Sequence, residues 1–371
     1  MKKIILFIAL CMTLGGCKKE EIFIPGKIAF LSVDYDRKET LIYIINLNGT
    51  NRKELTKISF PISMAASASL DGRKIAFITH PREQKGGSIW IVDTETGSQT
   101  RLTDGNSFNI IPRWSPNSKK LAFSSDCDGN FEVYTIDVDG KNLRRLTDNP
   151  LNDYVQDWSP DGKKIIFQRK FVKEEKNELT LVDKYGHIIK KIDQGTFTEE
   201  YPQLYLINPD GLNIEQLAEG FSKTRAPRWS PDGKNIVFDA EDEKGKLATY
   251  IIEVENKRLE KIMDDTKRFY MWSSDGKKVA FVDYNKDGPG ISVVNIEDKK
   301  IYKIIKGLKG KIWDFPIWTP DEKRIIFALI SPNEKNSDIY SLTLDGKLKN
   351  LTNTPNISEY SPQWLPIQEI K

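Results

Sequence analysis

Residues 158–167 read WSPDGKKIIF, and residues 229–238 repeat them as WSPDGKNIVF. Related ten-residue copies begin at Ala68, Trp114, Trp272 and Trp318. Successive copies are 43 to 46 residues apart, except for one gap of 71 between Trp158 and Trp229. A module that recurs at such a period across most of a chain predicts a repeat architecture, in which each copy builds one supersecondary unit.

Each copy predicts four short antiparallel strands. The Ser-Pro-Asp-Gly segment suits a tight turn, because Pro presets φ and Gly accepts the left-handed conformation that follows. Downstream, alternating apolar residues flank Asn-Gly or Asp-Gly, the strongest short-range signal of a β-hairpin. Segments of this kind occupy residues 41–56, 132–147 and 338–352.

Four-stranded units repeated at this period predict an all-β fold, a seven-bladed β-propeller of four-stranded antiparallel blades over residues 27–366. The second strands end in seven equivalent residues, Phe30, Phe77, Phe123, Phe167, Phe238, Phe281 and Phe327. Residues 358–364 resemble a first strand without a second strand after them. We therefore expect this C-terminal strand to pair into the N-terminal blade and close the ring. The long gap predicts an insertion at about 168–201 that contains an extra hairpin.

Six tryptophans share one register beside the tight turn. They are Trp114, Trp158, Trp229, Trp272, Trp318 and Trp364. An aromatic binding ring is one interpretation of this pattern. Packing between neighbouring blades is the favoured interpretation, because each tryptophan adjoins a turn and continues an apolar strand.

The repeat resembles that of TolB-type, WD-like β-propellers with PD40-type repeats. Residues 125–167, SDCDGNFEVYTIDVDGKNLRRLTDNPLNDYVQDWSPDGKKIIF, carry the resemblance, which extends over about residues 27–366. In that family the propeller contacts the peptidoglycan-associated lipoprotein, and similar propellers gate prolyl-oligopeptidase-type enzymes that carry a separate hydrolase domain. TolB-type proteins have an α/β domain and six blades, whereas this sequence predicts seven blades and no such domain.

The first seventeen residues, MKKIILFIALCMTLGGC, predict a lipoprotein signal peptide over residues 1–16. Two lysines precede an apolar run too short to span a bilayer. Small residues then lead to Cys17, as in the lipobox of bacterial lipoproteins, so Cys17 is expected to carry lipid. An ordinary secretory signal is the alternative. Residues 17–26 form a short tether, which predicts a protein anchored to the cell membrane or outer membrane and facing the periplasm or exterior.

Composition argues against several kinds of partner. Loss of Lys2 and Lys3 with the signal lowers the formal charge from +3 to +1, so no nucleic-acid partner is expected. Of three cysteines, Cys127 alone remains free for other chemistry, which rules out a disulfide framework. His80 and His187 are the only histidines and lie in unrelated segments. We therefore predict no metal site and no cofactor.

Strand directions predict two different faces. The tight turns gather on one face, which we call the turn face, and loops of varying length gather on the other, which we call the variable face. Loops of this kind on a rigid scaffold are frequent binding sites, although drift of surface loops is an alternative. Counting back from each tryptophan places a candidate ligand site at the channel mouth on the variable face, and a solvated rim is the other interpretation. Its residues are Asp153, Tyr154, Arg225, Arg268, Trp313, Asp314, Glu359 and Tyr360.

The sequence contains no nucleophile elbow, no His-Glu-x-x-His and no phosphate-binding loop. We therefore expect no catalytic residues and a non-enzymatic, lipid-anchored scaffold that docks a protein or peptide, or a glycan, at the variable face. The alternative is an envelope hydrolase or lyase that uses Asp153, Asp314 and Glu359.

Overall fold

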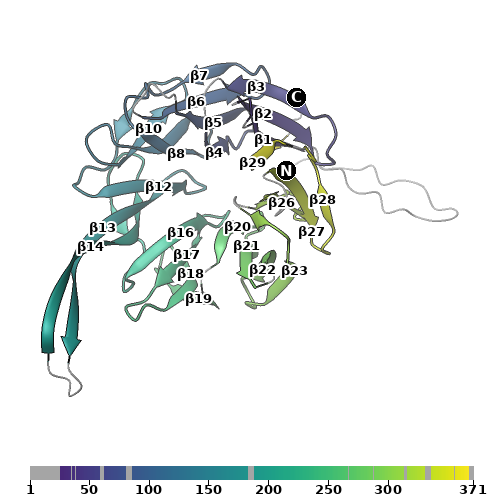
Figure 1. Cartoon of the computed structure of the whole chain (residues 1–371). Coiled ribbons are helices and arrows are strands. Elements are labelled where there is room, and N and C mark those ends of the chain that lie inside the picture. The colour runs from purple at the N-terminus through teal and green to yellow at the C-terminus, as the bar shows by residue number, and fades with distance from the viewer. Residues whose placement is uncertain are drawn as a thin grey trace.

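The computed structural model describes residues 26–366 apart from 35, 38, 59–61, 81–85, 183–187, 266, 287, 313–315, 331–335 and 355. Every regular element in this part of the chain is a β-strand. No helix among these residues is therefore long and apolar enough to cross a membrane. The strands form seven antiparallel sheets arranged around a centre (Figure 1), which confirms the predicted seven-bladed propeller.

The blades follow one another along the chain, and the strands of each blade are ordered from the channel outward. Blade 1 contains β29 (Ser358–Pro366), β1 (Gly26–Asp34), β2 (Glu39–Asn46) and β3 (Lys53–Ile58). Blade 2 contains β4 (Ile62–Ala68), β5 (Lys74–Thr79), β6 (Ser88–Asp93) and β7 (Gln99–Arg101). Blade 3 contains β8 (Asn109–Trp114), β9 (Lys120–Ser125), β10 (Glu132–Asp137) and β11 (Arg144–Arg145). Blades 4 and 5 contain β12 (Asn152–Trp158), β13 (Ile165–Val182), β14 (Ile188–Ile207) and β15 (Glu215–Gln216); and β16 (Lys223–Trp229), β17 (Asn235–Glu241), β18 (Leu247–Glu253) and β19 (Leu259–Asp264). Blades 6 and 7 contain β20 (Arg268–Trp272), β21 (Lys278–Asn285), β22 (Gly288–Asn295) and β23 (Ile301–Ile305); and β24 (Lys311–Ile312) with β25 (Ile317–Trp318), β26 (Arg324–Ile330), β27 (Ser337–Thr343) and β28 (Leu348–Asn350).

The last strand closes the ring. β29 pairs antiparallel with β1, so that Trp364 lies opposite Ile28 and Pro366 lies opposite Gly26. The inner strands contact one another in a full circuit, from β29 through β4, β8, β12, β16, β20 and β25 back to β29. The predicted closure by the C-terminal strand is thus confirmed, and the sheet edges that an open arc would leave unpaired are absent from this seam.

The repeated turn explains why the sequence spells the same residues. In blade 4 the Ser159 hydroxyl donates a hydrogen bond to Asp161 Oδ1, 2.7 Å away, and accepts one from the backbone N–H of Lys164 at 2.9 Å. Gly162 adopts a φ of 72°, where an L side chain would be strained. The same serine-to-aspartate bond recurs at Ser230 and Ser273. Each copy therefore needs these residue types to turn between its first two strands.

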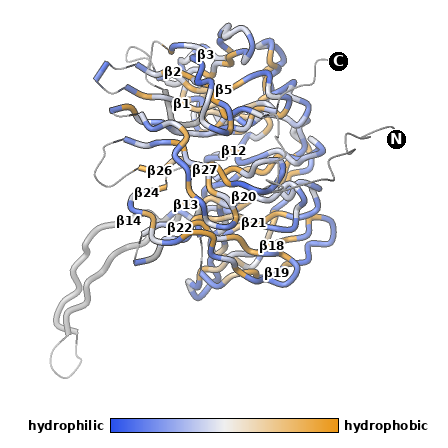
Figure 2. The backbone as a smooth tube through the Cα atoms, turned by 90° about the vertical axis from the view of Figure 1, so that its right-hand side faces the viewer, coloured by the Kyte–Doolittle hydropathy of each residue, from blue (hydrophilic) through white to orange (hydrophobic). Residues whose placement is uncertain are grey.

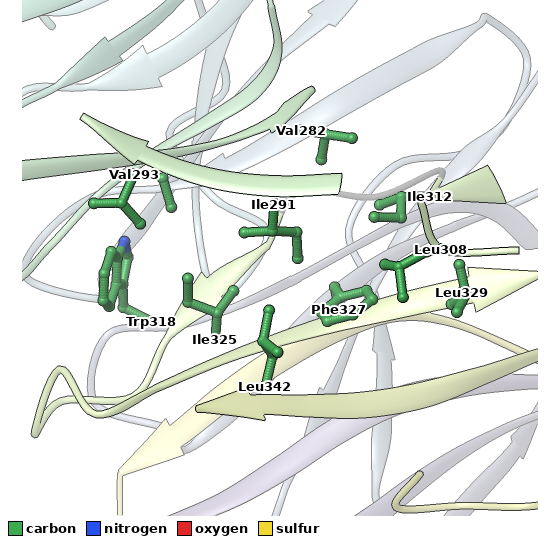
Figure 3. Close-up of a cluster of buried hydrophobic side chains, with 11 residues drawn as sticks. Val282, Ile291, Val293, Leu308, Ile312, Trp318, Ile325, Phe327, Leu329 and Leu342 are labelled. Atoms are coloured by element: carbon green, nitrogen blue, oxygen red, sulfur yellow. The ribbon is translucent and has the colours of Figure 1, made fainter. Parts of the chain in front are cut away.

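The apolar core lies between adjacent blades. Hydrophobic residues follow the strands and hydrophilic residues follow many of the turns in Figure 2. Figure 3 shows Val282 and Ile291 of blade 6 facing Phe327 and Leu342 of blade 7, with Trp318 at one end of the cluster. The seven equivalent phenylalanines of the second strands are all buried. Each blade therefore buries its apolar faces against its neighbours.

The tryptophans join neighbouring blades, as predicted. Trp158 of blade 4 packs in a cluster with Ala122 and Val133 of blade 3. Its indole N–H also donates to the backbone carbonyl of Arg113 in blade 3, 3.1 Å away. The same bond to the preceding blade is made by Trp114, Trp272 and Trp318. Trp229 differs, because its buried indole nitrogen has no hydrogen-bond partner among the described residues.

The inner strands carry a β-bulge that the repeat pattern did not predict. Their pairing with the second strands shifts register in six blades, for example between Ile110 and Arg113 in β8. Four residues three positions before a tryptophan have positive φ, namely Ile111, Ala226, Phe269 and Ser361. The bulge bends the strand and re-aims the side chains that follow it.

Blade 4 differs from the others by a long projection. β13 and β14 stay paired from Ile165 opposite Ile207 to Val182 opposite Ile188, and they extend well beyond the disc (Figure 1). Residues 179–182 pair with residues 188–192 as in the predicted hairpin, and this hairpin is the continuous outer end of β13 and β14.

Candidate functional site at the variable face and the channel

Asp153 is part of a buried ion pair. It lies on β12 opposite Arg169 of β13, whose Nε and Nη2 donate to the two carboxylate oxygens at 2.8 and 2.7 Å. Asn149 Nδ2 donates a further bond at 2.9 Å. The hydrogen bonds to Asp153 raise the pKa of Arg169. The Asp153 side chain is fully buried, so its carboxylate stabilises blade 4 and is closed to a ligand.

Glu359 occupies a similar position in blade 1. Arg52 Nη1 donates to its Oε1 at 2.7 Å, and the Glu359 side chain is fully buried. The Arg52 guanidinium lies 4.2 Å from the ring centroid of Tyr43, so it also makes a cation–π contact. The alternative of a hydrolase or lyase that uses Asp153 and Glu359 therefore finds no accessible carboxylate at either position. Asp314, its third residue, and Trp313 lie outside the described residues.

Two of the predicted residues lie at the surface of adjacent blades. Tyr154 of β12 packs against Phe131, with ring centroids 5.1 Å apart, and Lys170 Nζ lies 5.1 Å from the Tyr154 ring centroid. Arg225 of β16 is 45% exposed and lies 3.5 Å from Glu241. Both residues belong to strand ends at the variable face.

The remaining predicted residues are not found as exposed side chains at the variable face in the described part of the chain. Tyr360 is buried in β29. Arg268 pairs through its backbone with Val282, and its side chain lies outside the described part. Cys17, together with the whole predicted signal and most of the tether, also precedes the described residues.

Further polar and aromatic side chains surround Tyr154 and Arg225 where the long hairpin leaves the disc. Lys170 pairs with Glu200 at 2.7 Å, and Lys223 Nζ lies 5.5 Å from the ring centroid of Tyr201. Lys223 also pairs with Glu241 at 3.5 Å. Val172 adds an apolar side chain that is 57% exposed. We name this cluster the hairpin base; it comprises Tyr154, Lys170, Val172, Glu200, Tyr201, Lys223, Arg225 and Glu241.

The axial channel contains a second site, which was not predicted from the sequence. The residue directly before each tryptophan position lines a cavity of about 410 Å³, one residue from every blade. These residues are Ser67, Arg113, Asp157, Arg228, Met271, Ile317 and Gln363. Four blades read Pro-x-Trp at this point, at Pro112, Pro227, Pro316 and Pro362. A proline inside an apparent inner strand was the available signal of a bulge and of re-aimed side chains.

The charged residues of this axial cavity lie on three consecutive blades. Arg113 Nε donates to the carbonyl of Gln156 at 2.8 Å, and Arg228 Nη1 donates to the carbonyl of Pro227 at 2.7 Å. Asp157 lies on the blade between them. Burial lowers the pKa of Arg228 to about 10, although Asp157 opposes that shift. Burial also raises the pKa of Asp157, against the effect of both arginines.

Metal ligands do not gather in the part of the chain that the structure describes. No three His, Cys, Asp or Glu side chains come close enough there to hold an ion. Cys127 is free and exposed.

Comparison with known proteins confirms the resemblance of the repeat. A family model described as the TolB beta propeller domain matches residues 19–174. The Tol-Pal system protein TolB of Desulfosudis oleivorans is 32% identical over 30% of this chain and 24% of its own length. The β-propeller domain of the Trilobed protease from Pyrococcus furiosus has 20% identity and a TM-score of 0.61, with 88% of this chain and 95% of that chain covered. That domain is described as having an open velcro topology, whereas β29 closes the ring in this chain. Over residues 19–174 the repeat is thus similar to that of the TolB β-propeller domain, and the described chain has a β-propeller fold.

A peptidase relative corrects the expectation of a non-enzymatic protein. Dipeptidyl-peptidase 5 of Porphyromonas gingivalis is 26% identical over 71% of this chain and 43% of its own length. The lack of short catalytic motifs therefore does not separate this chain from proteins named as peptidases. The chain spans less than half the length of the curated relatives it matches.

Proposed function

We propose that the propeller binds a polypeptide partner at the hairpin base. The observation that carries this proposal is the grouping of Tyr154 and Tyr201, each beneath a lysine, beside exposed Val172 and Arg225. Tyrosine and arginine are enriched among residues that dominate binding at protein interfaces. Their ion pairs hold the long side chains in place, so less conformational entropy is lost on binding.

The names of the relatives support a polypeptide over other ligands. One relative is a component of the Tol-Pal system and another is a dipeptidyl-peptidase. A surface that docks polypeptide suits both kinds of protein. A glycan remains an outcome of the crosslinking experiment that tests the proposal.

The anchoring part of the proposal places the ring close to a membrane. Pro366 packs against the turn that contains Gly72 and pairs with Gly26, so the described ends lie at the turn face. Gly26 lies nine positions after Cys17, a reach of at most about 30 Å. Lipid on Cys17 would leave the hairpin base facing away from a cell-envelope membrane. Replacement of Cys17 by Ser should release the protein from the membrane fraction, and retention there would contradict the anchor.

A second candidate function is that of the propeller part of a peptidase, favoured by the similarity to dipeptidyl-peptidase 5 over 71% of the chain. Its test is the hydrolysis of fluorogenic dipeptide substrates by the purified protein. Release of the fluorophore that depends on the chain would establish this role, and no release above buffer would reject it for the chain.

Site-specific photocrosslinking tests the docking proposal. A photoreactive phenylalanine analogue replaces Val172 at the hairpin base or, as a control, Lys163 on the turn face, which is 81% exposed. We expect protease-sensitive adducts from position 172 in whole cells, and their loss when Tyr154→Ala and Arg225→Glu are combined. Equal adducts from both positions, no adduct from 172, or protease-resistant glycan adducts would each overturn polypeptide docking at the hairpin base.

A further inference from the structure

We infer that the axial cavity is a binding site for a carboxylate group, formed by Arg113 and Arg228. The two arginines occupy equivalent positions on blades 3 and 5 and line one cavity of about 410 Å³. This volume is within the range of small-molecule sites. The site is distinct from the hairpin base, because Pro231 of a tight turn also lines it, which places it toward the turn face.

The bulges fix the direction of both guanidinium groups. Each arginine follows a proline that follows a residue of positive φ, Ile111 in one case and Ala226 in the other. The hydrogen bond from Arg113 Nε to the Gln156 carbonyl and that from Arg228 Nη1 to the Pro227 carbonyl hold the side chains to the channel wall. A ligand would thus meet charges that are already oriented, which lowers the entropic cost of binding.

Charge balance favours a singly charged anion. Among the described residues that line the cavity, Arg113 and Arg228 carry two positive charges and Asp157 carries one negative charge. A monoanion would neutralise the single positive charge that is left over. The Asp157 carboxylate would repel the second negative charge of a phosphate dianion. Guanidinium groups also match the planar geometry of a carboxylate through paired N–H donors.

The rest of the wall favours an organic acid over a bare ion. Met271, Ile317 and the ring of Trp229 line the same cavity, and apolar walls with a few oriented charges are typical of small-ligand sites. A carboxylate of this kind can come from the C-terminus of a polypeptide or from a free small acid. The experiment separates these two sources.

Isothermal titration calorimetry with three probes tests the inference. The probes are N-acetyl-dialanine with a free carboxylate, the same compound as its C-terminal amide, and acetate. We expect the free acid to bind and the amide to bind at least tenfold more weakly, because a charge-assisted hydrogen bond is lost. Binding of acetate alone would assign the site to small free acids, and binding of the dipeptide alone to polypeptide termini.

Variants link any binding to the cavity. Arg228→Gln and Arg113→Gln should each lower the affinity for the free acid by about tenfold. Asp157→Asn should raise this affinity severalfold, because it removes a competing carboxylate. Arg258→Gln makes the same charge change at a side chain that is 77% exposed and lies outside the residues lining the cavity, so it should leave binding unchanged. Equal binding of acid and amide, no binding of either acid, or unaltered affinity in both cavity arginine variants with native circular dichroism would overturn the inference.

Discussion

The hydroxyl of Tyr270 in β20 donates a hydrogen bond to Oδ1 of Asp239 in β17, 2.6 Å away, and so joins blade 6 to blade 5. The hydroxyl of Thr249 donates to the same oxygen at 3.0 Å. Both residues of the inter-blade pair are buried. Burial raises the pKa of Asp239 to about 6, and the hydrogen bonds only partly oppose the shift.

This raised pKa predicts a pH-dependent stability. Because the folded pKa lies above the ordinary value of 3.8, the folded protein binds more protons than the unfolded chain between these values. The stabilisation by protonated Asp239 is complete below about pH 4 and is lost as the pH rises through about 6. The free energy of unfolding should fall by up to about 3 kcal/mol over this range. Urea unfolding at pH 4 and pH 7 measures this difference in the free energy of unfolding. The difference should be smaller in Asp239→Asn than in the unaltered protein. An unaltered pH dependence in the variant would contradict the assignment.

The tryptophan hydrogen bonds predict a difference between two matched substitutions. Trp158→Phe removes an indole donor that is bonded to the carbonyl of Arg113, and should cost about 1 kcal/mol more than Trp229→Phe. Trp229 serves as the control because its indole nitrogen is buried without a partner in the described structure. Chemical denaturation measures both free energies of unfolding. A larger loss in Trp229→Phe would show that the hydrogen bond does not set the order.

Ring closure predicts a large effect of removing the last strand. Deletion of residues 358–371 removes β29 and exposes the apolar surface that Leu365 and Tyr360 bury. The expected loss is at least about 4 kcal/mol, on the basis of about 2 kcal/mol for each large buried side chain. Deletion of residues 367–371 alone leaves β29 intact and is the control. Melting curves that agree between the two truncated proteins would refute closure by β29.

The Asp153–Arg169 pair predicts a structural role for a residue that the sequence suggested as a ligand. Asp153→Ala leaves the largely buried Arg169 without its two-point partner and should lower the free energy of unfolding by about 3 kcal/mol or more. Asp148→Ala removes a carboxylate that also pairs with an arginine, Arg145, but is 84% exposed, so its cost should stay below about 1 kcal/mol. Similar costs for both variants, measured by thermal unfolding, would contradict the role of burial.

The fold was predictable because its signals are local. The tight turn is determined locally, by the hydrogen bond and dihedral angles of Ser159, Asp161 and Gly162. The number of copies of this turn in the sequence therefore indicates the number of blades. The pairing of β29 with β1 followed from the mismatch between the two ends of the sequence. These inferences needed no knowledge of side-chain packing.

The site was less predictable because the inner strands are not regular. Ile111 and Ala226 have positive φ although neither is a glycine, so the sequence does not show where the strand departs from regular geometry. Positions counted back from each tryptophan are therefore correct only for a regular strand. Asp153 and Glu359 were therefore expected at an open mouth, whereas each is enclosed by an arginine from its own blade. Arg113 and Arg228 reach the channel because of the same bulges, so the pattern of a regular strand does not place them there.

The pairing of Gly26 with Pro366 also constrains how the molecule is made. Among the described strands, β1 is synthesised first and β29 last. During translation, the inner edge of blade 1 therefore stays uncovered until the strands of the other six blades have emerged. A nascent chain in that state presents an unpaired strand that other chains could join. We expect it to depend on a holding chaperone until release.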